Sequence, residues 1–124
     1  WTTQSALVKI YDSHGIFLFP SLCEGAGKSS LEAMARGLCV IASDDSGMRD
    51  YIMSGINGIL CPVGDTEAFA NAILKTVAHA SLDHMSLEAT NYARRKTWDG
   101  CATSLLTFFY SLLTMRKVSN VEPG

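Results

Sequence analysis

The 124-residue sequence has no long run of charge of either sign; only 18% of its residues are charged, and its formal net charge is −2. Proteins that bind nucleic acid through its phosphates carry basic patches or stripes, so no nucleic-acid partner is expected here. Repeats and low-complexity segments are also absent. With 48% hydrophobic residues, the composition is that of a well-packed globular chain. At this length it forms one domain at most.

Cysteine is sparse and scattered. The four cysteines, Cys23, Cys39, Cys61 and Cys101, form no CxxC pair and have no histidine at ligand spacing. We therefore expect neither a zinc site nor a disulfide framework. Cys39 and Cys61 lie inside apolar runs, where cysteine acts as a small buried hydrophobe. This usage favours a reducing, cytoplasmic compartment.

Signals for export or membrane insertion are lacking as well. Residues 1–15 have no basic start followed by an apolar block, so no signal peptide is predicted. The uncharged segment 101–115, CATSLLTFFYSLLTM, is shorter than the ~20 residues that a membrane span needs. It predicts a buried helix that lacks part of its cover.

Helical and strand periods alternate along the chain. The predicted strands are IFLFP (16–20), LCVIAS (38–43) and ILC (59–61), of which the first two read as strands covered on both faces. Helices are predicted around 6–11 and 31–35, at MRDYIM (48–53), and at 66–79, 82–96 and about 99–117; the tail 118–124 should fray. This alternation predicts an α/β fold, a Rossmann-like parallel sheet with flanking helices. Because three strands make a thin sheet, residues 1–124 are predicted to be a single, incomplete domain.

The glycine-rich loop before the second helix contains GAGKSS (25–30), which matches the end of a P-loop. Gly27, Lys28 and Ser29 fit GxxxxGK[ST], but the first glycine of that pattern would fall at Leu22, and Glu24 places an acid where phosphate must approach. A P-loop nucleoside triphosphatase is therefore a minor alternative. The loop still follows a parallel strand and precedes a helix, which is where open α/β sheets bind ligands and where anions are favoured.

The longer run PSLCEGAGKSSLEAMARGLCVIASDDSGMRDYIMSGINGILCPVGD (20–65) resembles the C-terminal, donor-binding domain of GT-B glycosyltransferases of group 1, the retaining family 4 class. That family reads PS-x-x-EGFG-x-x-x-LEAMA-x-G-x-PVIAT, then a glycine turn, then G-x-NG-x-L-x-PPGD. The match keeps order and spacing over 16–74, and the helix led by Trp98 is similar to the family's closing helix.

The resemblance implies transfer of a sugar from a nucleotide diphosphate sugar with retention of configuration, without metal or other cofactor. The catalytic Glu24 of the E-x7-E pair would reach the donor sugar's hydroxyls, and Glu32 would bond the ribose hydroxyls of the nucleotide. Carboxylates suit both tasks because each can accept hydrogen bonds from two vicinal hydroxyls. The implied donor-binding residues are Glu24, Gly25, Ala26, Gly27, Lys28, Ser29 and Glu32.

Each of these residues also has a purely structural interpretation. Ser29 and Glu32 fit the S-x-x-E capping box, and Lys28 could form an i, i+4 pair with Glu32 rather than contact the diphosphate. Asp44 and Asp45 follow a strand and precede a short helix, so capping is favoured over acid–base chemistry. Asp50 is expected near the start of that helix, where its negative charge would interact favourably with the helix dipole.

The resemblance has departures and gaps. Ala26 replaces the family's aromatic residue, which leaves the donor identity open, and Cys39 replaces a proline. The expected partners are the sugar-nucleotide donor and an N-terminal Rossmann-like acceptor domain that does not precede Trp1. Without that domain the chain alone should have no turnover. The C-terminal helix is expected to mediate self-association or peripheral membrane contact in the full-length enzyme. A non-catalytic binding or scaffold module is the main alternative.

Overall fold

The structure, a computed structural model of the chain, describes residues 2–78 and 81–119. It divides into two compact units, one ending at Arg94 and one beginning at Arg95, which are described separately below. The prediction that all 124 residues belong to one incomplete domain stays a prediction.

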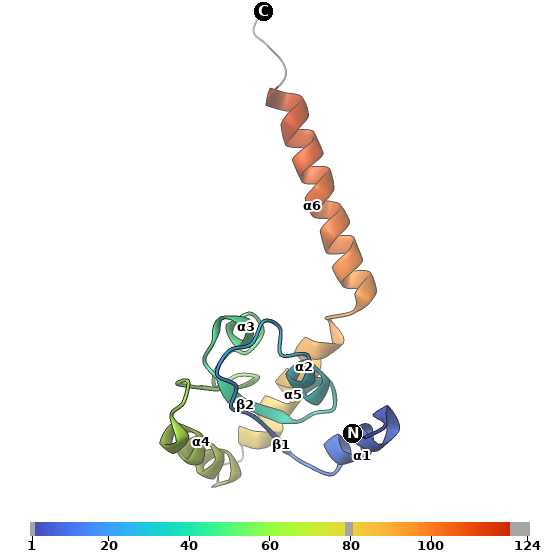
Figure 1. The fold of residues 1–124 in the computed structure, drawn as a ribbon. Helices are drawn as coiled ribbons and strands as arrows, with labels where there is room; N and C mark the ends of the chain where they lie inside the picture. The colour runs from blue at the N-terminus through green and yellow to red at the C-terminus, as the bar shows by residue number, and fades with distance from the viewer. Residues whose placement is uncertain (1, 79–80, 120–124) are drawn as a thin grey trace, which may run out of the picture. The chain divides into compact units, whose positions relative to one another are not determined.

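The first unit is built on a three-stranded parallel sheet (Figure 1). Its strands are β1 (Ile16–Phe19), β2 (Cys39–Ser43) and β3 (Gly58–Cys61), in the order β1-β2-β3. Both neighbouring pairs are parallel. The predicted α/β fold with a parallel sheet is therefore confirmed.

Helices separate the strands and close the chain. They are α1 (Gln4–Asp12), α2 (Lys28–Ala35), α3 (Ser46–Arg49), α4 (Thr66–Ala78), α5 (Ser81–Arg94) and α6 (Trp98–Ser119). All six were predicted, with bounds that differ by a few residues. Two predictions, the helix end at residue 79 and the tail beyond residue 119, lie outside the described residues.

Helix α3 differs most from its predicted range of 48–53. It begins at Ser46 because the Asp45 side chain caps it, accepting a hydrogen bond from the backbone N–H of Met48 at 3.0 Å. It ends at Arg49, so Asp50 is its C-cap residue. The prediction that Asp50 favours the start of this helix is wrong.

Side chains alternate between two apolar layers along the strands. Val40 and Ala42 of β2 face a core shared with α1, α2, α3 and α5, whereas Ile41 faces a smaller core with α4. All five residues of β2 are buried, as predicted for a strand covered on both faces. The same prediction is wrong for β1, where Leu18 is 46% exposed. This strand is at the sheet edge, and α4 packs mainly against β2 and β3.

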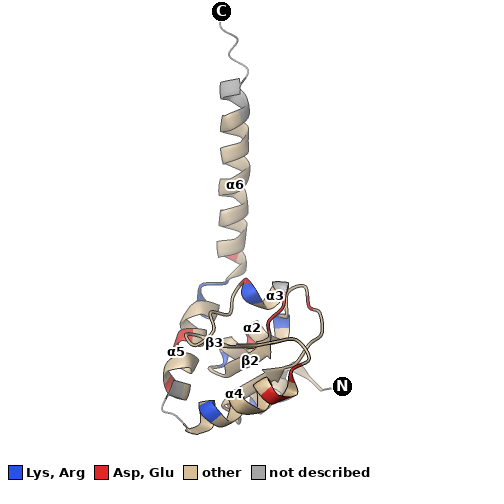
Figure 2. Cartoon of the chain, turned by 90° about the vertical axis from the view of Figure 1, so that its left-hand side faces the viewer, with Lys and Arg blue, Asp and Glu red and all other residues tan. Residues whose placement is uncertain are grey.

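The second unit consists of helix α6. Its apolar side chains are exposed within this unit, Phe108 and Leu112 among them, so the predicted buried helix is not realised in this chain. Between Gly100 and Met115 the helix carries no charge (Figure 2). Across residues 2–78 and 81–119, no helix combines the length and apolarity needed to cross a bilayer.

The cysteines are all free thiols. Cys39 and Cys61 are buried, as predicted, and Cys23 and Cys101 are exposed. Burial raises the pKa of the Cys39 thiol to about 11 and also raises that of Cys61. In the described part of the chain, no group of three or more His, Cys, Asp or Glu side chains is arranged to hold a metal ion.

We predict that the chain loses stability above about pH 9. Burial raises the Cys39 pKa from 9.0 to about 11 and the Tyr51 pKa from 10.0 to about 12. A group whose folded pKa is raised stabilises the fold below its unfolded pKa and loses that contribution as pH rises through its folded value. The free energy of unfolding in urea should therefore fall between about pH 9 and 12.

Two alanine variants separate this effect from general alkaline damage. Cys39→Ala should show a shallower decline between about pH 9 and 11, because the buried thiol no longer has to ionise on unfolding. Cys101→Ala, at an exposed position on α6, should decline as the natural chain does. Parallel pH profiles for all three proteins would contradict the prediction.

Candidate donor-binding loop

The glycine-rich loop lies at the carboxyl end of the sheet. It connects the end of β1 to α2 and touches the start of α3, which follows β2. A Cβ atom on Gly47 would lie 2.4 Å from the carbonyl oxygen of Gly25 and 2.5 Å from that of Glu24. Only glycine allows the loop to approach α3 so closely. The connections after two parallel strands therefore meet, at the edge where open α/β sheets bind ligands.

Gly27 makes the bend from which α2 begins. Its backbone is left-handed, with φ 42° and ψ 48°. A Cβ atom there would be 1.9 Å from Met48 Cε and 2.4 Å from the Tyr51 hydroxyl. Its carbonyl oxygen accepts hydrogen bonds from the Ser30 N–H, at 2.8 Å, and from the Tyr51 hydroxyl, at 3.1 Å. Conformation and space both require glycine at this position.

The N-terminus of α2 has no side-chain cap. Its N-cap residue is Gly27, and its first turn contains no acid. Among the described residues, the backbone N–H groups of Lys28 and Ser29 have no hydrogen-bond acceptor. The capping box considered for Ser29 and Glu32 is therefore not formed, because Ser29 lies inside the helix. Two donors remain open at the positive end of the helix dipole.

The two predicted glutamates flank this helix start. Glu24 is half-buried and Glu32 exposed. Neither carboxylate makes a hydrogen bond or an ion pair with the described residues, so both can accept hydrogen bonds from a ligand. Burial raises the pKa of Tyr11, and the Glu32 charge adds to that shift.

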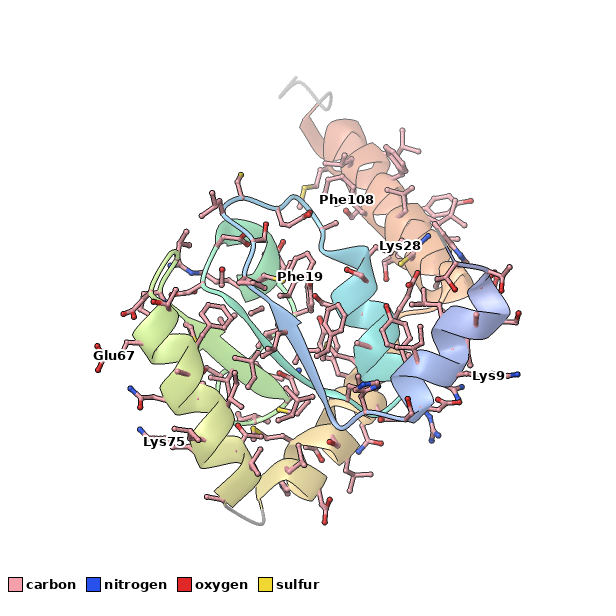
Figure 3. The ribbon with its side chains drawn as sticks, turned by 60° about the horizontal axis from the view of Figure 1, so that its bottom comes forward. Lys9, Phe19, Lys28, Glu67, Lys75 and Phe108 are labelled. Atoms are coloured by element: carbon pink, nitrogen blue, oxygen red, sulfur yellow. The ribbon has the colours of Figure 1, made fainter. Side chains whose placement is uncertain are left out.

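Lys28 is the first residue of α2 and is exposed, as Figure 3 shows at the N-terminal end of that helix. Its ammonium forms no ion pair within the described chain, so the alternative i, i+4 pair with Glu32 is wrong. A cation here opposes the helix dipole. It adds positive charge where an anionic ligand would meet the open amides.

The two aspartates after β2 have structural partners. Asp45 caps α3, as predicted. Asp44 instead binds the Arg49 guanidinium through two bonds of 2.6 and 3.1 Å, which lower the pKa of its carboxyl group. The two carboxylates are therefore not arranged as a pair for acid–base chemistry.

Three residues beneath the loop, Gly47, Met48 and Tyr51, were not among the predicted site residues. Gly47 belongs to the glycine turn that follows the second strand. The presence of that turn in the sequence could have indicated that Gly47 lies near the site. Nothing in the local sequence around Tyr51 indicates a contact with Gly27, because the two are 24 residues apart.

The sequence profile of the family described as "Glycosyl transferases group 1" matches residues 1–79. The chain belongs to this family. A D-inositol 3-phosphate glycosyltransferase of Corynebacterium urealyticum is 31% identical over 117 residues, 94% of this chain and 28% of the relative. A probable sucrose-phosphate synthase 3 of Arabidopsis thaliana is 38% identical over 85 residues, 65% of this chain and 8% of the relative.

Solved structures place the group 1 chain in the GT-B fold. Sucrose-phosphate synthase from Thermosynechococcus elongatus superposes with a TM-score of 0.79 at 26% identity, covering 92% of this chain and 29% of that one. Anabaena HepE, in a complex with UDP-glucose, superposes with a TM-score of 0.68 at 22% identity. The superposition covers 71% of this chain and 25% of the HepE chain. The fold of this chain thus matches part of the C-terminal domain of GT-B glycosyltransferases, and the chain spans less than a third of the length of these relatives.

We predict that Gly27→Ala lowers the free energy of unfolding by about 1–3 kcal/mol, because a non-glycine residue is strained at positive φ and the new Cβ collides with Met48 and Tyr51. Gly25→Ala in the same loop is the matched control. A Cβ on Gly25 meets nothing within 4 Å, and its φ is not positive, so the change should stay within about 0.5 kcal/mol. Urea unfolding measures both; equal losses would contradict the assignment of the bend.

Proposed function

We propose that this chain supplies the donor-binding part of a retaining glycosyltransferase, an enzyme that moves a sugar from a nucleotide diphosphate sugar to an acceptor. One observation carries the proposal: the start of α2 has no side-chain cap and lies between Glu24 and Glu32, whose carboxylates have no partner among the described residues. The open amides and the carboxylates together suit a ligand with an anionic centre and hydroxyl groups at both ends.

In this proposal the diphosphate lies at the N-terminus of α2. The N–H groups of Lys28 and Ser29 donate to its oxygens, and the Lys28 ammonium adds a positive charge. Gly25 and Ala26 have no bulky side chain, so the backbone approaches the sugar closely. Because the helix and basic side chains balance the diphosphate charge, no metal or other cofactor is invoked.

The two acids bind opposite ends of the donor. Glu32, four residues into the helix from Lys28, accepts from the vicinal ribose hydroxyls, which a carboxylate can bind as a pair. Glu24, in the loop, accepts from hydroxyls of the transferred sugar and is the catalytic residue in the sense that it touches the reacting sugar. The UDP-glucose complex of the HepE relative makes UDP-glucose a suitable first probe.

The reaction needs more of the enzyme than this chain. Because the chain spans 28% of the D-inositol 3-phosphate glycosyltransferase relative, we propose that an N-terminal Rossmann-like domain supplies the acceptor site and that the isolated chain has no turnover. Its four free thiols favour a cytoplasmic location, with contact at a membrane surface in the full-length enzyme.

We predict that Glu32→Gln weakens the binding of both a nucleoside diphosphate and its sugar conjugate by roughly five- to tenfold, because charged hydrogen bonds are about twice as strong as neutral ones. Glu24→Gln should weaken the binding of the sugar conjugate and leave the binding of the nucleoside diphosphate unchanged. NMR titration of the chain with UDP, GDP, ADP and UDP-glucose measures these affinities. Glu67→Gln, on the surface of α4 (Figure 3), is the matched control and should change neither.

The alternatives give different titrations. A non-catalytic scaffold module would show no shifts with any of the four ligands at millimolar concentration. A P-loop triphosphatase would bind ATP in a manner that requires magnesium and Lys28. Shifts confined to α4 or α6 would equally overturn the proposed donor site.

Helix α6 presents an apolar face that we propose is covered by the other domain of the enzyme. At helical spacing, Leu105, Phe109 and Leu112 share one side. The opposite side carries Thr107, Ser111 and Thr114, whose hydroxyls donate to backbone carbonyls of the same helix. Thr107, for example, donates to the Thr103 carbonyl at 2.9 Å. In the absence of its partner domain, this face leads the isolated chain to self-associate.

We predict that sedimentation velocity at high protein concentration shows oligomers that the double variant Leu105→Glu, Leu112→Glu converts to monomers, because charges on the apolar face prevent its burial. Thr107→Glu, on the hydroxyl side, should remain associated. A natural chain that stays monomeric, or a Thr107 variant that dissociates equally, would rule out association through this face.

A further inference from the structure

Tyr51 lies beneath the bend of the donor loop. It follows α3, and its side chain is only 6% exposed. Its hydroxyl donates to the carbonyl oxygen of Gly27 at 3.1 Å and lies 3.0 Å from Met48 Sδ. Burial raises the pKa of Tyr51 to about 12 against an opposing effect of the Ser30 hydroxyl, and the charges of Asp45 and Glu24 raise it further, so the hydroxyl keeps its proton at neutral pH. It can therefore act as a hydrogen-bond donor under all ordinary conditions.

The backbone of Tyr51 is itself held in place. Asn57, which is fully buried, donates from Nδ2 to the Tyr51 carbonyl at 2.9 Å and accepts from the Met53 N–H at 2.7 Å. Asn57 immediately precedes β3. A chain of hydrogen bonds thus runs from the start of a strand through Tyr51 to the loop.

The phenol hydroxyl lies among buried polar groups. The Ser30 hydroxyl in the first turn of α2 is fully buried, and one buried carboxylate oxygen of Asp45 has no hydrogen-bond partner among the described residues. Both residues lie close enough to Tyr51 to influence its ionisation. In such a site a hydrogen bond is strong and the loss of a donor is costly, because water does not replace it.

The same Gly27 carbonyl also accepts from the Ser30 N–H at 2.8 Å, which is the first hydrogen bond of α2. Any shift of this carbonyl therefore moves the first turn of the helix. The open N–H groups of Lys28 and Ser29 lie between Gly27 and Ser30 in the sequence. Their direction depends on where the carbonyl is held.

We propose that Tyr51 is a positioning residue for the donor: its buried hydroxyl fixes the Gly27 carbonyl and thereby aims the amides of Lys28 and Ser29 at the diphosphate. The inference rests on the proposed function and extends it to a residue outside the glycine-rich loop. Tyr51 itself does not touch the ligand in this scheme.

The test is Tyr51→Phe in the full 124-residue chain. The variant keeps the ring and loses only the hydroxyl, so the core stays filled. We expect hydrogen exchange of the Ser30 amide to rise about fivefold, the effect of losing one ordinary hydrogen bond. The affinity for UDP, GDP or ADP, whichever binds the natural chain most tightly, should fall roughly three- to tenfold in an NMR titration.

The matched control is Tyr92→Phe on α5. This change also removes a tyrosine hydroxyl that donates to a backbone carbonyl, because the Tyr92 hydroxyl donates to the Asp50 carbonyl oxygen at 3.3 Å. It should leave the Ser30 exchange rate and the nucleotide affinity unchanged. Both variants are compared without urea, under conditions in which unfolding measurements show that they are fully folded. A general loss of stability then does not change the measured affinity.

The outcomes separate the two proposals. Nucleotide binding by the natural chain with equal affinity in Tyr51→Phe overturns the positioning role and leaves the proposed function intact. Equal losses in the Tyr51 and Tyr92 variants overturn it too. If the natural chain binds none of the three nucleotides, the proposed function fails and the positioning role fails with it.

Discussion

The left-handed backbone of Gly27 is the constraint on which the candidate site depends. Because the residue at this bend has no side chain, it can pass within van der Waals reach of Met48 and Tyr51 and still begin a helix. For the same reason it offers no side-chain oxygen to cap that helix. The feature that lets the loop pack against α3 therefore also leaves backbone donors open at the carboxyl edge of the sheet.

Helix α2 is poorly optimised for its own stability. It starts with a lysine at the positive end of its dipole and has no acid in its first turn. Its stability comes instead from tertiary packing, since Ala33 and Met34 are fully buried in the core that α2 shares with β2 and α5. A helix stabilised by its buried side can keep an N-terminus without a side-chain cap.

The sheet serves the site in two ways. The buried strand β2 anchors both faces of the fold, and its carboxyl end leads directly to the cap of α3 at Asp45. The edge strand β1 leads into the glutamate loop, and Gly47 allows these two connections to touch. This architecture brings Glu24, Gly27 and Glu32 to one end of the fold.

The amino-acid sequence by itself determined the order and type of the elements, because apolar periodicity and glycine breaks are local properties. It also determined the family, because the ordered spacing of residues 20–65 holds without knowledge of any contact. Only the tertiary structure decided that Gly27 rather than Ser29 starts α2, that Asp44 pairs with Arg49, and that Tyr51 supports the loop. The local sequence offers a capping box at Ser29, whereas the contact between Gly27 and Tyr51 joins residues 24 positions apart and has no local sequence signal.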